Sequence, residues 1–362
     1  MNAPIGCPRT LGVETSCDET AVAVLRGDGS VEVDLLASQE AAHAPYGGVV
    51  PELASREHLR ALRRLAADAL RRCEAPPELV AVTSGPGLVG SLLVGIRFAA
   101  AFAWGRSLPL VAVDHLDGHL HSPFLDSSGG PAEPMPERVL ALVASGGHSG
   151  WYLIEEGRAR RLGRTRDDAA GETFDKVAQA LGLPYPGGPA VDRLARAGDP
   201  GAVTLPRPRR RDSRVDFSFS GLKSAAVRWI REHGLDGAGA GDPPREVRDL
   251  LASFERAVVD QLLAPLQELV ERHRPLMIAA SGGVAANTEL RHRLSREGAS
   301  LGLPVRLPPP RLTTDNAAMV ARAGQLAFVR GERSDPRRLD ARPREAWQPP
   351  GMRGLSPAAG VV

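Results

Sequence analysis

The chain is poor in lysine, aromatic residues and cysteine, and each shortage excludes a class of protein. Only two of its 45 basic residues are lysines. The net charge is +2, which excludes nucleic-acid binding through overall charge, so any contact with a nucleic acid must come from a local patch. Aromatic residues at 4% argue against a stacking platform for single-stranded bases. Three widely spaced cysteines, Cys7, Cys17 and Cys73, suit neither a disulfide framework nor a zinc knuckle, so we expect a reducing, cytoplasmic environment.

Targeting signals and uncharged membrane-length runs are also lacking. The start, MNAPIGCPRT, has neither the charged segment nor the apolar core of a signal peptide. The most apolar run, LVGSLLVGIRFAAAFAWG at 88–105, is about as long as a membrane span. Arg97 lies in its middle, which favours a buried helix and predicts no membrane contact.

Two similar segments suggest an internal duplication. LGVETSCDETAVAVL at 11–25 and VLALVASGGHSGWYLI at 139–154 both read as strand, polar turn and strand. A Pro/Gly/Ser-rich stretch, DSSGGPAEPMPER, separates the two halves. Strands alternate with helices in each half, which predicts α/β layers. We therefore expect domains at 10–130 and 138–314, a final helix at about 315–330 that can pack back on the first domain, and an extended tail at 331–362.

Three histidines lie close together in VDHLDGHLHS. Asp114 can cap a helix that starts at His115, which places His115 and His119 on one face and leaves His121 off it. Two imidazoles so spaced can hold one divalent metal, although this spacing also occurs by chance. Asp315, in TTDNAA, can be a third ligand or simply the N-cap of the final helix, and the sequence alone favours the cap.

Glycine-rich turns offer a second kind of site. SGPGLVG at 84–90 and SGGVAAN at 281–287 precede helices, where backbone N–H groups can cradle a phosphate or a carboxylate, or merely form tight turns. Neither matches a P-loop or a dinucleotide fingerprint. Asn287 can hydrogen-bond a base or ribose, and Asp175, Gly188 and Asp192 can line the same pocket. The acidic residues around Asp175 can instead simply form the solvated start of a helix, without binding a ligand.

The basic residues give one candidate for phosphate contact. PRPRRRDSR places five arginines between Arg207 and Arg214, although most such runs are solvated loops. The two lysines, Lys176 and Lys223, stand out in an arginine-rich chain. We expect each to contact a phosphate group or to position carboxylates in a cleft.

The ordered motifs closely resemble those of the TsaD family of tRNA N6-adenosine threonylcarbamoyltransferases, formerly called O-sialoglycoprotein endopeptidases. The resemblance covers about residues 10–330, and YGGVVPELASREH resembles the bacterial and organellar branch. The motifs that carry it are LGVETSCDETAVAV, HAPYGGVVPELASREH, GPGLVGSLLVG, HLDGHL, SGGHS, DDAAGETFDK, YPGGPAVDRLA, DFSFSGLKSA, SGGVAANTELR and TTDNAAMVA.

The resemblance implies an actin-like (ASKHA) α/β fold of two duplicated domains with a ligand cleft between them. It implies one divalent metal per subunit, Fe²⁺ or alternatively Zn²⁺, on His115, His119 and Asp315. Archaeal relatives have a metal-binding tyrosine where Val143 stands, so this chain offers one ligand fewer. The positions that match the family's ligand contacts are Val143, Ala144, Ser145, Gly146, Gly147, Asp175, Gly188, Asp192 and Asn287.

The implied reaction transfers a threonylcarbamoyl group from threonylcarbamoyl-AMP to N6 of the adenosine beside the anticodon, in tRNAs that read codons beginning with A. The donor is a mixed anhydride with AMP as leaving group, so no protein nucleophile is required. Asp18 and Glu19, in the first hairpin turn, are candidates for the base, although a solvated acidic turn is nearly as good a reading. The family also implies a TsaB-like paralogue and a TsaE-like ATPase as partners. We expect the paralogue on the leucine-faced helix at 51–74, with Leu62 in the contact.

Three rival functions are weaker. A phosphotransferase of the same fold class would bind magnesium through carboxylates, whereas this chain offers a histidine pair with Asp315. A zinc protease would carry glutamate where Leu116 stands. A non-catalytic partner subunit would have a degenerate cleft, whereas HLDGHL, SGGVAAN and TTDNAA are all retained.

Overall fold

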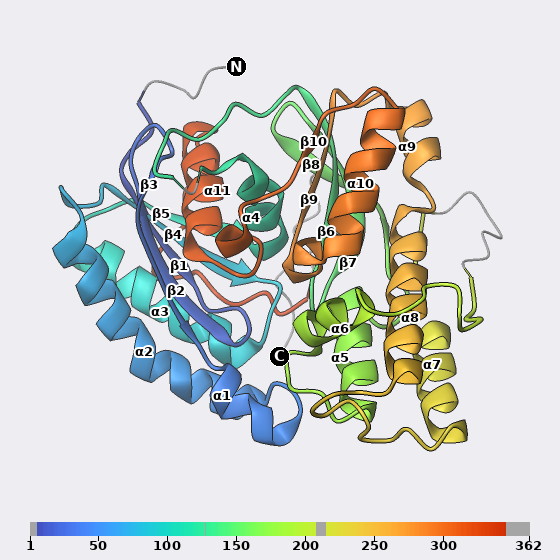
Figure 1. Cartoon of the computed structure of the whole chain (residues 1–362). Helices are drawn as coiled ribbons and strands as arrows, with labels where there is room; N and C mark the ends of the chain where they lie inside the picture. Colours follow the sequence, from blue (N-terminus) through green and yellow to red (C-terminus); the bar gives the residue numbers. More distant parts are fainter. Residues whose placement is uncertain (1–5, 127, 208–214, 345–362) are drawn as a thin grey trace, which may run out of the picture.

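The computed structural model describes residues 6–126, 128–207 and 215–344, which form two five-stranded sheets with helices around them (Figure 1). The first sheet has the order β3-β2-β1-β4-β5 and the second β10-β9-β6-β7-β8. The strands are β1 (Thr10–Glu14), β2 (Glu19–Leu25), β3 (Val31–Ser38), β4 (Leu79–Gly85), β5 (Leu110–Asp114), β6 (Arg138–Ala144), β7 (Ser149–Glu155), β8 (Arg158–Arg164), β9 (Met277–Ser281) and β10 (Val305–Arg306).

The two sheets repeat one topology. In each, three strands in chain order pair antiparallel, β1-β2-β3 and β6-β7-β8. The first strand of each set also pairs in parallel with a later strand, which pairs in parallel with the last one, as β1-β4-β5 and β6-β9-β10. The predicted duplication of an α/β unit is therefore confirmed. The domain boundaries stay a prediction.

Helices cover both faces of each sheet. Their bounds are α1 (Glu40–His43), α2 (Pro51–Arg72), α3 (Val89–Gly105), α4 (His115–His121), α5 (Ala170–Ala180), α6 (Gly187–Ala195), α7 (Ser220–Glu232), α8 (Arg245–Leu263), α9 (Leu266–His273), α10 (Thr288–Ser300) and α11 (Ala317–Val329). In the described parts of the chain, none of these helices is both long and apolar enough to cross a membrane.

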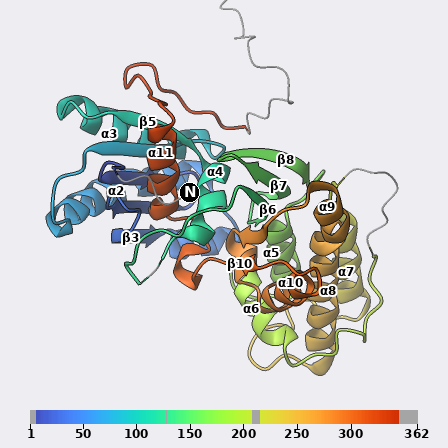
Figure 2. The same ribbon diagram turned by 90° about the horizontal axis from the view of Figure 1, so that it is seen from above.

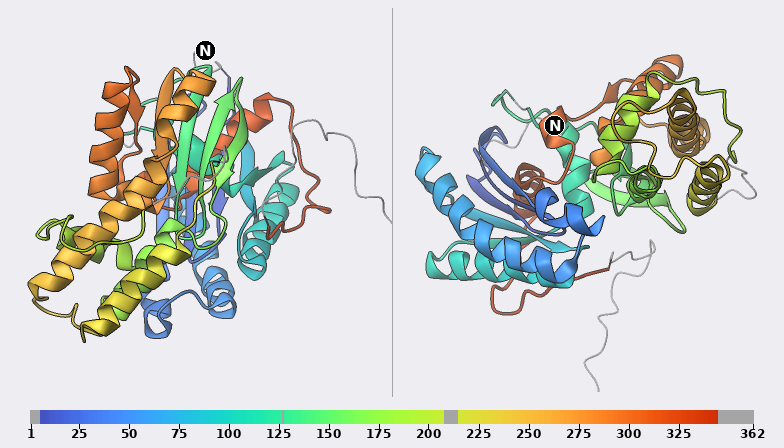
Figure 3. Two further views of the ribbon diagram at one scale, coloured as in Figure 1. Left: turned by 90° about the vertical axis from the view of Figure 1, so that its right-hand side faces the viewer. Right: turned by 60° about the horizontal axis from the view of Figure 1, so that its bottom comes forward.

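Small residues of the central strands lie on one face of the first sheet, beneath α11, although Leu79, Val111 and Val113 lie on that face as well. Large residues such as Leu11, Val13 and Val80 pack under α2 and α3, which lie side by side along one face (Figure 3). Small residues such as Ala21 and Ala81 face α11 on the other side. Because side chains alternate along a strand, this difference allows one helix to approach the sheet closely.

The structure corrects the expected role of the leucines on α2. Leu62 is only 2% exposed and lies in the core between α2 and the first sheet, together with Leu65. The outward side of the helix carries arginines and a single strongly exposed leucine, Leu59. The leucine stripe therefore marks the core, and a partner would meet the arginine-bearing face.

Helix α4 lies between the two sheets and links them (Figure 2). Its Leu116 and Leu120 pack against Val139 and Val143 of β6. Its other side contacts α11, which in turn packs on β1, β2 and β4 of the first sheet. The final helix of the sequence therefore joins the first sheet, and α4 and α11 form the layer between the two halves.

The segment after α11 returns along the first sheet. The backbone N–H of Ser334 donates to the carbonyl oxygen of Leu110 at 2.8 Å, and that of Arg342 donates to the carbonyl oxygen of Ser84 at 2.7 Å. Leu339 and Ala341 pack on the core beneath α2 and α3. The described part of the tail is thus bound to the domain, and the rest of the predicted tail lies outside the described residues.

We expect the approach of α11 to the sheet to tolerate no added methyl group. A Cβ built on Gly12 of β1 would lie 2.3 Å from the carbonyl oxygen of Ala317. Gly12→Ala should lower the free energy of unfolding by about 1–3 kcal/mol, as overpacking does, measured by urea denaturation. Gly105→Ala is the matched control, because open space surrounds that position at the end of α3. Equal stability of both variants would contradict this account of the packing.

Candidate metal and ligand site

Helix α4 begins as the sequence predicts. The carboxylate of Asp114 accepts a hydrogen bond from the N–H of Leu116 at 3.0 Å and caps the helix. His115 and His119 are 4% and 0% exposed, so both rings lie inside the protein. His121, also buried, lies 3.8 Å from the carboxylate of Asp117, and burial together with nearby arginines lowers its pKa to about 3.

Asp315 meets both histidines of the predicted pair. Its Oδ1 lies 3.1 Å from Nε2 of His119 and 3.5 Å from Nε2 of His115. Ligands about 2.1 Å from a tetrahedral metal are about 3.4 Å apart, so these separations fit one ion. The alternative role of Asp315 is wrong, because Asn316 caps α11 by accepting from the N–H of Met319 at 2.8 Å.

The electrostatics favour a cation among these residues. Burial disfavours the charged ring of His115, but Asp315 and Glu14 outweigh burial and raise its pKa to about 9. Burial also opposes ionisation of Asp315, yet the histidines hold its pKa far below the usual value. A divalent ion would supply the same compensation and release a proton from His115, because ligands bind metals in their deprotonated form.

Glu14, at the end of β1, orients His115, a role that the sequence patterns did not predict. This fully buried carboxylate accepts from Nδ1 of His115 at 3.0 Å, from Oγ1 of Thr83 at 2.6 Å and from the N–H of Ser16 at 2.5 Å. The bond assigns the proton to Nδ1 and leaves Nε2 facing Asp315, the arrangement common around protein metal ions. An acidic residue inside a buried strand was the available signal, because such residues almost always have a partner.

The predicted acidic turn of the first hairpin approaches the same group. Asp18 and Glu19 are half-buried. Burial, and next the negative charge of Asp315, raise the pKa of Glu19 well above its ordinary value. Glu19 thus holds a proton more readily than an ordinary glutamate does, partly because of the charge of the candidate metal ligand Asp315.

The equivalent hairpin of the second sheet contributes backbone. Val143 and Ala144 are fully buried, so their side chains serve the core. The N–H of Ser145 donates to the carbonyl oxygen of His148 at 2.7 Å, which closes a tight turn with Gly146 and Gly147 at its exposed tip. The ring of His148 lies 6.4 Å from that of His115 between centroids, so this turn faces the metal group.

The remaining predicted ligand contacts fall into two hydrogen-bonded groups. Asp175 accepts from the N–H of Gly187 at 2.7 Å and holds the start of α6, which carries Gly188. Asp192 accepts from the N–H of Thr288 at 2.8 Å and, weakly, from the amide of Asn287 at 3.4 Å. The carboxylates of Asp175 and Asp192 therefore also have structural partners.

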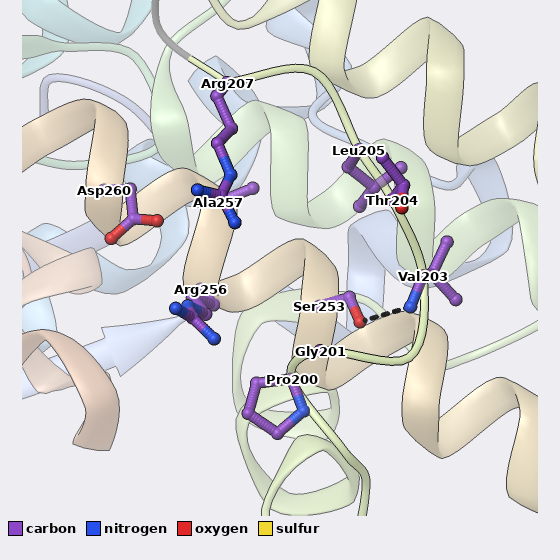
Figure 4. A pocket seen from close by; sticks show the side chains of 10 residues that line it. All are labelled: Pro200, Gly201, Val203, Thr204, Leu205, Arg207, Ser253, Arg256, Ala257 and Asp260. Carbon is purple, nitrogen blue, oxygen red and sulfur yellow. Dashed lines mark hydrogen bonds between the residues drawn. The ribbon is translucent and has the colours of Figure 1, made fainter.

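The basic candidates all belong to the second half of the chain. Nζ of Lys223 pairs with the carboxylate of Asp168 at 2.5 Å, whereas Lys176 is exposed on α5. Of the predicted arginine run only Arg207 lies within the described residues. It lines a small pocket beside α8 with Arg256, and there the N–H of Val203 donates to Oγ of Ser253 at 3.1 Å (Figure 4).

Fold and site together define an actin-like α/β protein in which a His-His-Asp group that can hold a metal ion lies between two duplicated halves. Known structures with this fold include HypF of T. kodakarensis, with a TM-score of 0.58 at 14% identity, covering 91% of this chain and 49% of that one. A phosphate- and nucleotide-bound full-length HypF gives a TM-score of 0.55 at 13% identity, covering 90% of this chain and 47% of that one. At these identities only the fold is shared.

Sequence comparison is more specific. The family model TsaD, described as tRNA N6-adenosine threonylcarbamoyltransferase, matches residues 31–322. A Pelobacter propionicus protein of the same description is 46% identical over 90% of this chain and 94% of its own length. One from Anaeromyxobacter dehalogenans is 47% identical over 94% of this chain and 99% of its own length. The chain belongs to the TsaD family, which confirms the predicted resemblance.

We expect Glu14→Gln to weaken metal binding without unfolding the protein. The amide can still accept from Thr83 but loses the negative charge that holds His115, and loss of such an outer partner typically costs about 10–100-fold in metal affinity. Titration of the metal-free protein with Co²⁺, followed by absorption, measures the effect. Asp117→Asn is the matched control, because Asp117 lies on α4 near His121 rather than the ligand pair. Wild-type affinity in Glu14→Gln would contradict the assigned role.

Proposed function

We propose that the chain transfers the threonylcarbamoyl group of threonylcarbamoyl-AMP to N6 of the adenosine next to the anticodon, in tRNAs that read codons beginning with A. The reaction takes place in the cytoplasm. The observation that carries the proposal is the convergence of His115, His119 and Asp315 beside the Gly146–Gly147 turn, in a chain of the TsaD family.

The donor dictates what the protein must do. Its mixed anhydride already contains a good leaving group, so the chain needs to bind and orient rather than to attack. Backbone N–H groups of Gly146 and Gly147, together with Asp175, Gly188, Asp192 and Asn287, bind the adenylate. Holding the donor carbonyl against the acceptor amine turns a bimolecular reaction into an oriented one, and such orientation is worth up to about 7–11 kcal/mol of the barrier.

The candidate metal ligands suit iron or zinc. Two imidazoles and one carboxylate are donors that both ions accept, and we propose Fe²⁺, with Zn²⁺ as the alternative. Bound there, the ion would hold oxygens of the donor and polarise its carbonyl. Three protein ligands leave coordination positions for substrate or water.

Glu19 is our first choice for the proton acceptor, with Asp18 assisting. As N6 bonds to the donor carbonyl carbon, the bond from that carbon to the AMP oxygen breaks, and one N6 proton must leave. The repulsion from Asp315 that raises the pKa of Glu19 falls when Asp315 shares its charge with a cation. The carboxyl would then ionise more readily, and a general base must be ionised to accept the proton.

The first test follows product formation. Purified protein receives threonylcarbamoyl-AMP and tRNA, with and without TsaB-like and TsaE-like partners, and modified adenosine is measured. His119→Ala should lower the rate by about 100-fold or more, because one of three metal ligands is lost.

His292→Ala, at an exposed position on α10, is the matched control and should keep full activity. Product formation that survives replacement of both His115 and His119 would overturn the metal-assisted mechanism. ATP turnover without threonylcarbamoyl transfer would favour the phosphotransferase alternative.

We further propose that a TsaB-like paralogue binds the outward face of α2. Leu59 is 65% exposed there among arginines, so an apolar centre with a basic rim is available. Leu59→Asp should weaken co-elution with the paralogue on size exclusion by about tenfold or more. Leu276→Asp is the matched control, because Leu276 is also an exposed leucine, 51% exposed, but lies on the second half of the chain. This variant should bind the paralogue as the wild type does. Unchanged co-elution of Leu59→Asp would exclude this face.

A further inference from the structure

Glu255 is a buried acid that the proposed function leaves without a role. It lies in the middle of α8 and is only 6% exposed. Removing a carboxylate from water is costly unless it is paired or hydrogen-bonded. Its nearest polar partner is the amide of Asn287, whose Nδ2 lies 2.6 Å from Oε1 of Glu255.

The amide of Asn287 has little freedom left. Its Oδ1 accepts from the N–H of Leu290 at 2.9 Å and so caps α10. One N–H donates to Glu255. The second faces Oδ1 of Asp192 at 3.4 Å, a contact too long to satisfy it fully. That N–H is therefore available to an acceptor atom of a ligand.

The neighbours of Asn287 are fixed as well. Asp192 accepts from the backbone N–H and the hydroxyl of Thr288, at 2.8 and 3.1 Å, and from Arg196 at 2.5 Å. Three helices, α6, α8 and α10, thus meet at one polar cluster. Of the side chains in it, Glu255 accepts the shorter hydrogen bond from Nδ2 of Asn287, and this bond and the one from the N–H of Leu290 together fix the orientation of the amide.

We propose that Glu255 is a positioning residue for the nucleotide part of the donor, acting through Asn287. It holds one N–H of the amide and thereby presents the other to the adenylate. The inference rests on the proposed function, because it assumes that Asn287 contacts that ligand.

The ionisation of Glu255 makes this role pH-dependent. The pKa of Glu255 is raised to about 7, chiefly by burial. The negative charges of Asp192 and Glu289 raise this pKa further, whereas the hydrogen bond from Asn287 and the positive charge of Arg196 lower it. The carboxyl is therefore ionised above about pH 7 and neutral below it. A hydrogen bond to a carboxylate is stronger than one to a neutral acid, so affinity for the nucleotide should fall as the pH drops below 7.

Glu255→Ala and Glu255→Gln separate positioning from packing. In Glu255→Ala we expect KM for threonylcarbamoyl-AMP to rise about tenfold, equivalent to about 1.4 kcal/mol, with kcat, the KM for tRNA and metal content nearly unchanged. Glu255→Gln keeps an acceptor but has no charge, so its KM should be raised at pH 8 to about the value that the wild type reaches below pH 7, and should no longer depend on pH across this range.

Asp260→Asn is the matched control. Asp260 also links α8 to α10, through an ion pair with Arg293 at 3.0 Å, but it does not contact Asn287. If Glu255 only stabilised the packing of α8 on α10, then Glu255→Ala and Asp260→Asn would both lower the melting temperature, and neither would change the KM for threonylcarbamoyl-AMP. An unchanged KM in Glu255→Ala, or an equal rise in Asp260→Asn, would overturn the inference. If Glu255→Ala does not fold, the pH profile of Glu255→Gln decides.

AMP binding, measured by calorimetry, separates this inference from the proposed function. If Asn287→Ala weakens AMP binding and Glu255→Ala does not, only the role of Glu255 is excluded. If Asn287→Ala binds AMP like the wild type, the assignment of Asn287 to the donor fails, and this inference fails with it. The expected result is weakened AMP binding in both variants, with no further loss when they are combined.

Discussion

The site depends on the close packing of α11 on the first sheet. Gly12 and the small residues around it let this helix approach, and the turn before it then places Asp315 beside α4. The same α4 buries Leu116 and Leu120 against the second sheet. One layer of two helices therefore fixes the relative position of both halves and the geometry of the three candidate metal ligands.

This packing has an electrostatic consequence. Glu14, Glu19 and Asp315 bring three carboxyl groups into one buried region, which two histidines only partly compensate. The two groups shift in opposite directions. The histidines lower the pKa of Asp315, whereas burial and the charge of Asp315 raise the pKa of Glu19. A cation at the His-His-Asp group would lower the pKa of Glu19 and would replace the protonated histidines as the charge that keeps Asp315 ionised, because it stabilises the ionised form of every carboxylate nearby. The charge pattern thus supports a metal independently of the spacing of the ligands.

The sequence predicted features that depend on neighbouring residues better than features that depend on tertiary contacts. The cap at Asp114, the spacing of His115 and His119, and the duplicated hairpins all follow from a few neighbouring residues. The bond that His115 donates to Glu14 joins residues 101 positions apart, so no local pattern contains it. Asn316 caps α11 through a local bond from Met319, but Asp315 and Asn316 are adjacent and both residue types favour an N-cap, so the sequence did not show which of them caps the helix. The leucine stripe of α2 showed which side is apolar, but periodicity cannot tell a core from a partner surface.

The duplication places different chemical groups at equivalent positions of the two halves. The turns after β1 and β6 occupy the same position in the repeated topology. In the first half this turn carries Asp18 and precedes Glu19, while in the second it ends in the exposed glycines 146 and 147. One copy of the hairpin thus supplies ionisable side chains and the other supplies bare backbone. A reaction that needs both a proton acceptor and a cradle for an adenylate can use the two copies facing each other, whereas either half alone would lack one of the two functions.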